Sequence, residues 1–514
     1  YMDSEDSHNL SGTVKVLEGL TASSAQVTNG FGYIAFGTDH RGVYSATAPV
    51  YQDQTKTAFA TPITNTNADT EYAADGVRKT DGRYVFTQDK TTITTGGTSI
   101  AGGPWTPNIN AAISNTNTTN PLKINMKGHD LAVHINATSH TTGISAIGDG
   151  SEIVIDNAGD LSVNSVGTGM DAALFANGGG KITINAKEGK TIRLRTEAAN
   201  KANGAVVKTM NGAAGARSSI TLNGQVDIEA DGVKSNEGLS AVASDIRVAG
   251  GTIKATGGAQ YAIRAYGEFT STNDGRVYVN TVENGAGQAM GAKTNKTVLV
   301  GNISTSGSMS GKGKGIVNLG LNTADSSWTG DYAESNDGTV NLWMGSNATW
   351  TGKTGANSNL NMNLLYTGSL WKLTGTSHVK NLAASSSEGR NVFDMRGTAA
   401  TDKLNIDQFG GKGYFLYGNT VTTTHDADTD TDVKHVTVNG ADVHVKKAER
   451  GSEITLHTAS NGKWDWTISA GAVEKNLTSR VVKMLANKLY YEGAITKEDN
   501  LALKVKVGEG LTTS

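Results

Sequence analysis

The sequence has no cysteine, only 5 prolines, and few aromatic or charged residues among its 514 positions. Without cysteine, no disulfide framework can hold the fold, and no stray thiol can mispair in an oxidising compartment. The formal net charge of −3 offers no basic surface of the size that nucleic acid requires. No apolar run reaches the roughly 18 residues of a membrane-spanning helix. We therefore expect neither nucleic-acid binding nor a transmembrane helix.

Glycine is abundant instead, with 64 residues, and asparagine and threonine are frequent throughout. A chain of this length exceeds one ordinary globular core, so we expect either several domains or a repeat array. Low charge combined with Gly, Asn, Thr and β-branched residues favours many short strands joined by tight turns. Disorder is the competing interpretation of this composition. Regularly spaced Ile, Val and Leu residues argue against it over most of the chain.

From residue 122 to about 266, short apolar triplets alternate with polar turns in a fixed three-part order. The first strand of each period begins with an apolar pair at alternate positions: Leu122, Ile153, Ile182, Ile220 and Ile246. The second strand begins at Leu131, Leu161, Ile192, Val226 and Ile253. The third is rich in small residues and covers 143–147, 172–176, 204–208, 239–243 and 261–265.

These periods start 26 to 38 residues apart, and the turns between their strands are too short to hold a helical crossover. Three strands per period are typical of a parallel β-helix, in which each coil buries its inward side chains by stacking on the next. A β-sandwich is the rival fold, because it too has many short strands, and Asn-Gly turns do occur. The three-part order favours an all-β, right-handed parallel β-helix.

The two ends of the chain resemble each other. Residues 9–23 read NLSGTVKVLEGLTAS and residues 500–514 read NLALKVKVGEGLTTS, with ten of fifteen positions identical. The shared pattern predicts a strand that ends in a glycine turn. We expect a module that begins and ends inside a tandem array; the alternative is chance similarity between glycine-rich turns. Ahead of the second copy, apolar residues at every fourth position predict one amphipathic helix: Val473, Leu477, Val481, Leu485 and Leu489.

Tryptophan is concentrated beyond residue 320, and two interpretations compete. Exposed indole rings at successive coils would form platforms for sugar rings, whereas buried ones would thicken and stiffen the core, since large rings bury the most area. The core interpretation is favoured. The residues concerned are Trp328, Trp343, Trp350, Trp371, Trp464 and Trp466.

Candidate catalytic residues are sparse. The nearest match to a serine-protease nucleophile loop is 148–151, Gly-Asp-Gly-Ser, whose order is wrong and whose position predicts a turn. A β-helix polysaccharide lyase or hydrolase would need paired carboxylates or clustered basic groups. The available residues are Asp149, Asp156, Asp171, Arg193 and Arg264; we expect turn positions and a solvated face instead.

Metal-binding patterns are equally weak. The run at 425–433 carries hard oxygen ligands that suit Ca²⁺, but it lacks the glycine-rich nonapeptide of calcium-binding β-rolls, so an exposed acidic loop is favoured. Its potential ligands are His425, Asp426, Asp428, Asp430 and Asp432. The histidines at 129, 134 and 140 have no metal-ligand spacing. We assign no catalytic, cofactor-binding or metal-binding residue and expect no cofactor.

Several motifs carry a family resemblance. The succession SWTG (327–330), GTVNL (338–342), WTG (350–352) and GSLWKLTGTSHVKNL (368–382) resembles the C-terminal passenger region of pertactin-like autotransporters. The FDMRG and DKLNI segments (393–406) look like the start of their autochaperone region, and 75–95 resembles the lead-in to the helix in such surface proteins. The resemblance covers most of 75–514. It implies a β-helix displayed outside the cell, with roles in adhesion or biofilm formation.

Five segments are expected on these grounds. Residues 1–24 would be the tail of a preceding repeat, and 25–121 an N-terminal segment leading into the solenoid. Three-strand coils would occupy 122–320, followed by a Trp-rich, autochaperone-like end at 321–470. A helix-plus-strand cap would close the unit at 471–514.

The predicted function is that of a non-enzymatic extracellular module, displayed from the bacterial outer membrane as a stalk or adhesin. It would attach to glycans or proteins of the host, of other bacteria or of the matrix, and would contact its own neighbouring repeat units. One alternative is a structural repeat unit that assembles end to end in a long surface fibre. A second alternative is a β-helix carbohydrate-active enzyme.

Overall fold

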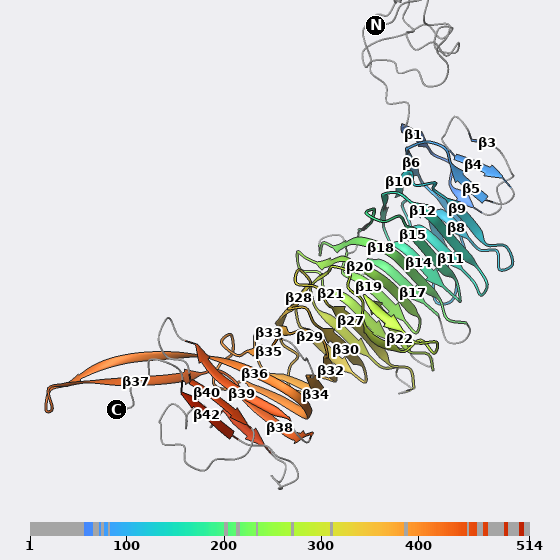
Figure 1. Cartoon of the computed structure of the whole chain (residues 1–514). Helices are drawn as coiled ribbons and strands as arrows, with labels where there is room; N and C mark the ends of the chain where they lie inside the picture. The colour runs from blue at the N-terminus through green and yellow to red at the C-terminus, as the bar shows by residue number, and fades with distance from the viewer. Residues whose placement is uncertain are drawn as a thin grey trace, which may run out of the picture.

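The protein is described by a computed structural model in which almost every element is a short strand stacked along one axis (Figure 1). It describes residues 56–64, 71–72, 77–80, 83–199, 204–211, 216–232, 235–268, 272–308, 312–384, 389–449, 452–459, 466–470, 488–491 and 503–507. Over these ranges there is no helix, and so none that could cross a membrane.

The central coils each contribute three strands, and each strand pairs in parallel with its counterpart one coil away. The lead strands are β9 (Leu122–Asn125), β12 (Glu152–Ala158), β15 (Lys181–Ala186), the first part of β18 (Ser219–Ala230) and of β20 (Asp245–Ala255), β22 (Gly275–Val279) and β27 (Gly315–Leu321). The second strands are β10 (Asp130–Asn136), β13 (Leu161–Gly167), β16 (Thr191–Ala198), the later parts of β18 and β20, β25 (Thr297–Val300) and β28 (Ser327–Thr329). The third strands are β11 (Thr141–Ile147), β14 (Ala172–Asn177), β17 (Ala205–Met210), β19 (Glu237–Val242), β21 (Tyr261–Tyr266), β26 (Ile303–Ser306) and β29 (Tyr332–Asn336).

The predicted parallel β-helix is confirmed by these registers. Ile153 pairs with Ile182 and Leu161 with Ile192, so like residues from successive coils lie directly above one another. In β13, buried and half-buried positions alternate, as strands with one inward face require. The β-sandwich alternative is excluded because its strands would pair mainly as antiparallel hairpins.

The third strands β11, β14 and β19 are buried at every position, and β17 at all but one, so these strands are covered on both faces, which was not expected from the sequence. Their inner side chains join the main core, while their outer ones form a second apolar cluster that includes Phe175, Met210 and Val242. The segment around β7 (Thr98–Ile100) covers part of the outer face of these strands. There, Asn177 Nδ2 of β14 donates to the carbonyl of Gly102 at 2.9 Å. Small residues in these strands therefore reflect a two-sided packing environment.

Parallel stacking begins before residue 122. In the segment predicted to lead into the solenoid, β5 (Arg83–Phe86), β6 (Lys90–Thr95) and β8 (Ile109–Asn115) pair in parallel with β9, β10 and β11. Ahead of them, β1 (Lys56–Phe59) and β2 (Ile63–Thr64) add parallel strands to β6 and β8. The short strands β3 (Glu71–Tyr72) and β4 (Val77–Thr80) pair antiparallel on the β5 side.

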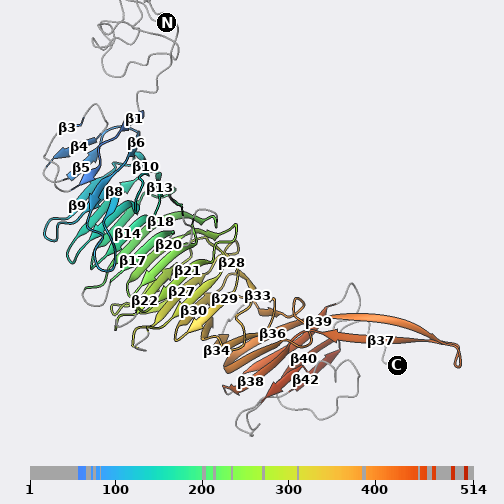
Figure 2. The same ribbon diagram turned by 180° about the vertical axis from the view of Figure 1, so that it is seen from behind.

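After β29 the coils shorten from three strands to two. The remaining coil strands are β30 (Thr339–Met344), β31 (Thr349–Gly352), β32 (Leu360–Leu364), β33 (Ser369–Leu373), β34 (Ser377–Ala384), β35 (Asn391–Asp394) and β36 (Lys403–Asp426). The last part of β36 leaves the stack and pairs antiparallel with β37 (Thr431–Asn439), and this hairpin projects from the solenoid as a long arm (Figure 2).

Beyond the arm, β38 (Asp442–Ala448) and β39 (Glu453–Ala459) return to pair in parallel with β36. Two antiparallel strands follow, β40 (Trp466–Ala470) and β42 (Leu503–Val507), while β41 (Leu489–Tyr491) pairs in parallel with β38. The strand predicted in the second end repeat is β42. The predicted helix lies outside the described residues except for Leu489, which belongs to a strand, and the first end repeat also lies outside them.

Candidate binding groove

Three of the tryptophans form a ladder inside the solenoid. Trp328, Trp350 and Trp371 are at most 1% exposed. Their rings stack with centroids 4.4 Å and 4.2 Å apart. Each indole Nε1 donates to a glycine carbonyl of the preceding coil, at 3.0 to 3.1 Å. The core interpretation is confirmed for these three residues, and they are not platforms for sugar.

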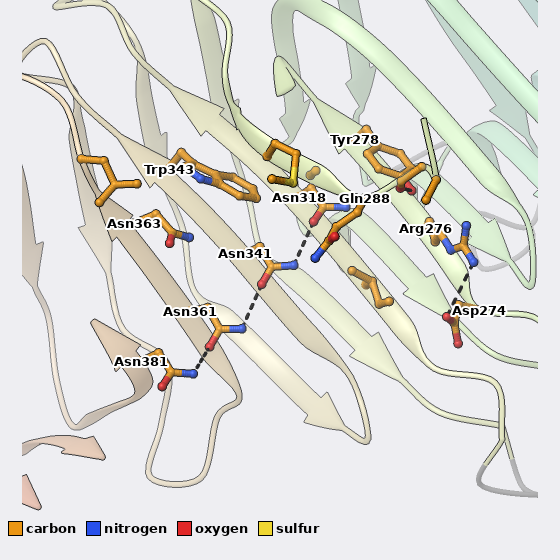
Figure 3. Close-up of a pocket in the computed structure, with 16 residues that line it drawn as sticks. Asp274, Arg276, Tyr278, Gln288, Asn318, Asn341, Trp343, Asn361, Asn363 and Asn381 are labelled. Atoms are coloured by element: carbon orange, nitrogen blue, oxygen red, sulfur yellow. Dashed lines mark hydrogen bonds and ion pairs between the residues drawn. The ribbon is translucent and has the colours of Figure 1, made fainter. Parts of the chain in front are cut away.

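A groove of about 630 Å³ lies on the outer, lateral face of the lead strands β22, β27, β30, β32 and β34. Its outer wall is a hairpin made of β23 (Thr281–Glu283) and β24 (Ala289–Ala292), inserted between lead strand β22 and second strand β25. Figure 3 shows the lining side chains, with Trp343 and Tyr278 along one side and a row of asparagines across the strands.

The floor of the groove is a ladder of asparagine amides. Asn341 Nδ2 donates to Asn318 Oδ1 at 2.9 Å and Asn361 Nδ2 to Asn341 Oδ1 at 2.9 Å. Asn381 continues the row, donating to Asn361 Oδ1 at 2.8 Å. The ladder forms because the parallel register pairs each of these residues with the next. The coil period thus turns a repeated residue type into a continuous polar track.

The hairpin wall is fastened to the solenoid at several points. The Tyr278 hydroxyl donates to the Gly287 carbonyl at 2.5 Å, and the Ala292 amide donates to the Tyr366 hydroxyl at 2.9 Å. Arg247 of β20, the register partner of Tyr278, has its Nε 2.9 Å from Glu283 Oε2. These contacts hold the hairpin against the solenoid.

The groove is electrically balanced. Its charged lining residues are Asp274 and Arg276, whose Oδ2 and Nη2 atoms lie 3.8 Å apart. Burial, with the Asp245 carboxylate adding to it, raises the pKa of Tyr278 above its ordinary value. The tyrosine therefore stays protonated and keeps its hydrogen bond to the hairpin. The lining is otherwise made of amides and apolar groups.

The segment resembling a nucleophile loop is a turn, as predicted. Gly148 and Gly150 have φ angles of +101° and +85°, which only glycine adopts without strain. The Ser151 side chain is fully buried and its hydroxyl donates to the Asn115 carbonyl at 2.7 Å. This serine is a structural tether between coils.

The other candidate catalytic residues each have a separate local partner. Asp156 accepts a hydrogen bond from Asn185 at 2.7 Å on the lateral face. Asp171 is buried and accepts one from the Thr141 amide at 2.8 Å, and burial raises its pKa to about 7. Arg193 and Arg264 pair with Asp227 and Glu237 at 3.4 Å and 3.0 Å respectively. The structure does not gather these residues into one site.

The acidic run forms the tip of the β36–β37 arm. His425 Nδ1 lies 3.1 Å from Asp432 and its Nε2 lies 3.4 Å from Asp430, with all three side chains more than half exposed. The described residues contain no group of three or more His, Asp or Glu side chains placed to hold a metal ion. Of the other histidines, His129 lies 3.1 Å from Asp89 and His140 accepts a hydrogen bond from the Met170 amide.

The residues that line the groove were not among the candidate site residues expected from the sequence. A signal existed in the repeated apolar–Asn–apolar triplets at 317–319, 340–342 and 360–362, which place asparagine on the face opposite the core. The intervals of 23, 20 and 20 residues along the ladder become meaningful only once the strand register is known.

The chain matches no protein-family model and no curated protein sequence. Among solved structures it is similar to the autotransporter UpaB from E. coli strain CFT073, with a TM-score of 0.37 and 15% sequence identity. The alignment covers 81% of this chain and 98% of that chain. The fold assignment itself rests on the parallel strand registers.

Proposed function

We propose that this chain is a non-enzymatic attachment module, the passenger portion of an autotransporter, displayed on the bacterial surface. The observation that carries the proposal is the amide-floored groove on the lateral face of a long solenoid. The passenger assignment is supported by the Trp-bearing motifs at 327–382 and by the parallel β-helix into which they fold.

The geometry favours binding because the groove is built in advance. Its floor consists of paired strands and its wall is fastened by Tyr278, Tyr366 and Arg247. A rigid site loses little conformational entropy when a ligand binds, so more of the contact energy appears as affinity. Described coils lie on both sides of the groove, from β9 to β20 before it and from β35 to β39 after it, so the groove sits within a long stack.

Cleavage is disfavoured as the purpose of the groove. Glycoside hydrolysis ordinarily uses two carboxyl groups that flank the scissile bond. Among the described lining residues Asp274 is the single carboxylate, and it faces Arg276. The enzyme alternative would require a second acidic group at the same place. The fibre alternative depends on the chain ends, most of which lie outside the described residues, and stays a prediction.

The test is an attachment assay with the whole chain coupled to beads. We expect coated beads to adhere to host cells, extracellular matrix or bacterial biofilm above the level of uncoated beads. The double variant Asn341→Ala/Asn361→Ala should lose adhesion. The matched control is Asn223→Ala, an exposed residue that donates to Asn185 in a separate amide row outside the groove. Equal adhesion of coated and uncoated beads on every surface would overturn the proposal.

A further inference from the structure

We propose that the groove binds a linear, uncharged saccharide chain that lies along the asparagine ladder beside the β23–β24 hairpin. This inference rests on the proposed function and narrows it to one class of ligand and one site. It follows from five properties of the groove: spare amide groups, their regular spacing, balanced charge, the absence of a free strand edge in the floor, and exposed apolar side chains at the rim.

The amides have hydrogen-bonding capacity left over. An asparagine side chain carries two N–H donors and an oxygen with two lone pairs. In the ladder, Asn341 and Asn361 each use one N–H toward the preceding coil and one lone pair toward the next. One donor and one acceptor per residue remain, which matches a sugar hydroxyl, itself both donor and acceptor. Gln288 projects from the hairpin toward the same row (Figure 3).

The spacing of the ladder suits a polymer. Successive amides come from adjacent strands, so they repeat at the strand separation of about 4.8 Å. Asn341, Asn361 and Asn381 therefore present amide groups repeatedly along the solenoid axis, while Asn318 is only 3% exposed and begins the row as a buried partner. A polysaccharide likewise presents hydroxyl groups at regular intervals, whereas a compact ligand would engage only one or two rungs.

The charge of the lining argues for an uncharged chain. An anionic polysaccharide would be held by lysine or arginine side chains directed into the groove. Arg276 is the single cationic lining residue in the described part of the chain, and Asp274 lies beside it. With that pair in place, the floor offers neutral amides alone, so a sulfated or carboxylated chain would gain nothing from electrostatic attraction.

The floor also disfavours a peptide in extended conformation. Such a peptide commonly binds by adding a strand to an exposed sheet edge. Here β27, β30 and β32 each pair with a strand on both sides, so their backbone groups are already used. Side chains must make the contacts instead. A saccharide, which is recognised through amides and apolar surfaces, fits that restriction better.

Apolar contact is available at the rim. Met290 of the hairpin is 58% exposed and Leu365, immediately after β32, is 45% exposed, although both are apolar and line the groove. Trp343, a third apolar lining residue, is only 6% exposed. Binding sites typically combine such apolar walls with a few fixed polar groups. The C–H faces of a sugar ring would cover these side chains.

The experiment is a glycan array probed with the whole chain, followed by calorimetric titration of each hit. We expect neutral oligosaccharides to bind and longer chains to bind more tightly. Losing one amide hydrogen-bonding group, as in Asn361→Ala, should weaken binding by about tenfold. Gln288→Ala, on the exposed hairpin, should also weaken saccharide binding, and it leaves the stacked coils of the solenoid unchanged. Asn223→Ala should leave the affinity unchanged.

Each outcome bears on the proposal. Binding of neutral chains that depends on Asn361 and Gln288 supports it. Binding of anionic chains or peptides alone overturns the ligand class while leaving the attachment function intact, because the beads still adhere. Neutral binding that is unaffected by both variants places the site elsewhere and also overturns it. If, in addition, coated beads adhere no better than uncoated beads, the proposed attachment function is itself overturned.

Discussion

Replacing Trp350 with alanine tests the claim that the tryptophan ladder stabilises the C-terminal coils. The ring is fully buried between Trp328 and Trp371, at centroid distances of 4.4 Å and 4.2 Å. Truncating a buried aromatic residue to alanine costs about 3–5 kcal/mol. Each lost stacking contact adds roughly 0.5–1.5 kcal/mol. We expect the variant to lose about 5 kcal/mol of unfolding free energy.

A second variant of Trp350 separates the contribution of the stacked ring from that of the Nε1 hydrogen bond. Trp350→Phe keeps an aromatic ring between the neighbours but removes the Nε1 donor that bonds to the Gly330 carbonyl at 3.0 Å. The free energy of unfolding should fall by about 1–3 kcal/mol, the usual penalty for leaving a buried acceptor without its donor. The matched control is Trp105→Ala, because Trp105 is 64% exposed, and its change should stay within about 0.5 kcal/mol.

The assay is urea denaturation followed by far-UV circular dichroism, with hydrogen exchange to locate the effect. Solenoid stability is approximately a sum over coils and their neighbour contacts, so the loss should be local. Faster exchange is expected in β28, β31 and β33, with the coils before β20 unchanged. A Trp350→Ala variant as stable as the Trp105→Ala control would refute the reasoning. So would faster exchange spread evenly along the chain.

Three further predictions concern single residues. Gly352→Ala should lower the free energy of unfolding, measured by urea denaturation, by about 1–3 kcal/mol, because its new Cβ would lie 1.8 Å from the Gly330 carbonyl oxygen. In the control Gly285→Ala the new Cβ meets no atom within 4 Å, so the stability should not change. Burial raises the pKa of Asp171 from 3.8 to about 7. The protonated carboxyl therefore contributes to the free energy of unfolding in full below pH 3.8, and this contribution is lost as the pH rises through about 7. Denaturation across that range should show this fall, and Asp171→Asn should abolish it. Glu283→Ala should speed hydrogen exchange in the β23–β24 hairpin, since it removes the Arg247 ion pair, and unchanged exchange there would contradict the fastened wall.

The coil strands could be predicted because their inward and outward positions alternate. Triplets such as Ile153-x-Ile155 leave one face apolar, and their fixed order reflects the parallel register that the structure shows. The predicted turn at 148–151 followed from local chemistry, since glycine there adopts positive φ. Both inferences depend on residues close together in sequence, where local conformational preference is strong.

The hairpin beside the groove was not predicted, although its signal was visible. Asn284-Gly285 is one of the Asn-Gly pairs of the sequence, a pair type common in the hairpins of a β-sandwich, and it lies at the tip between β23 and β24. Asn284 Oδ1 accepts hydrogen bonds from the Ala286 and Gln288 amides, both at 2.9 Å, as a turn-forming asparagine does. The turn chemistry was therefore informative locally, but it marks one insertion in the solenoid and says nothing about the global fold.

The groove itself was beyond the reach of sequence patterns because it depends on register. Asn318, Asn341 and Asn361 are scattered polar residues until the strand pairing places them in one row. Their spacing also changes where the coils shorten from three strands to two, so a search for one fixed period would miss them. Long-range register is set by packing of the whole coil, which no local window contains.

The tryptophan and asparagine ladders have the same physical origin. Parallel, in-register coils place each residue above its counterpart, so an inward Trp at one coil stacks on the next Trp, and an outward Asn bonds to the next Asn. The two-strand coils carry both at once, with Asn341 on β30 and Trp350 on β31. Each coil therefore adds one stacked aromatic ring to the core and one amide to the groove. With each added coil, both the stability of the solenoid and the length of the asparagine ladder increase. This explains why the proposed site lies where the core is most aromatic.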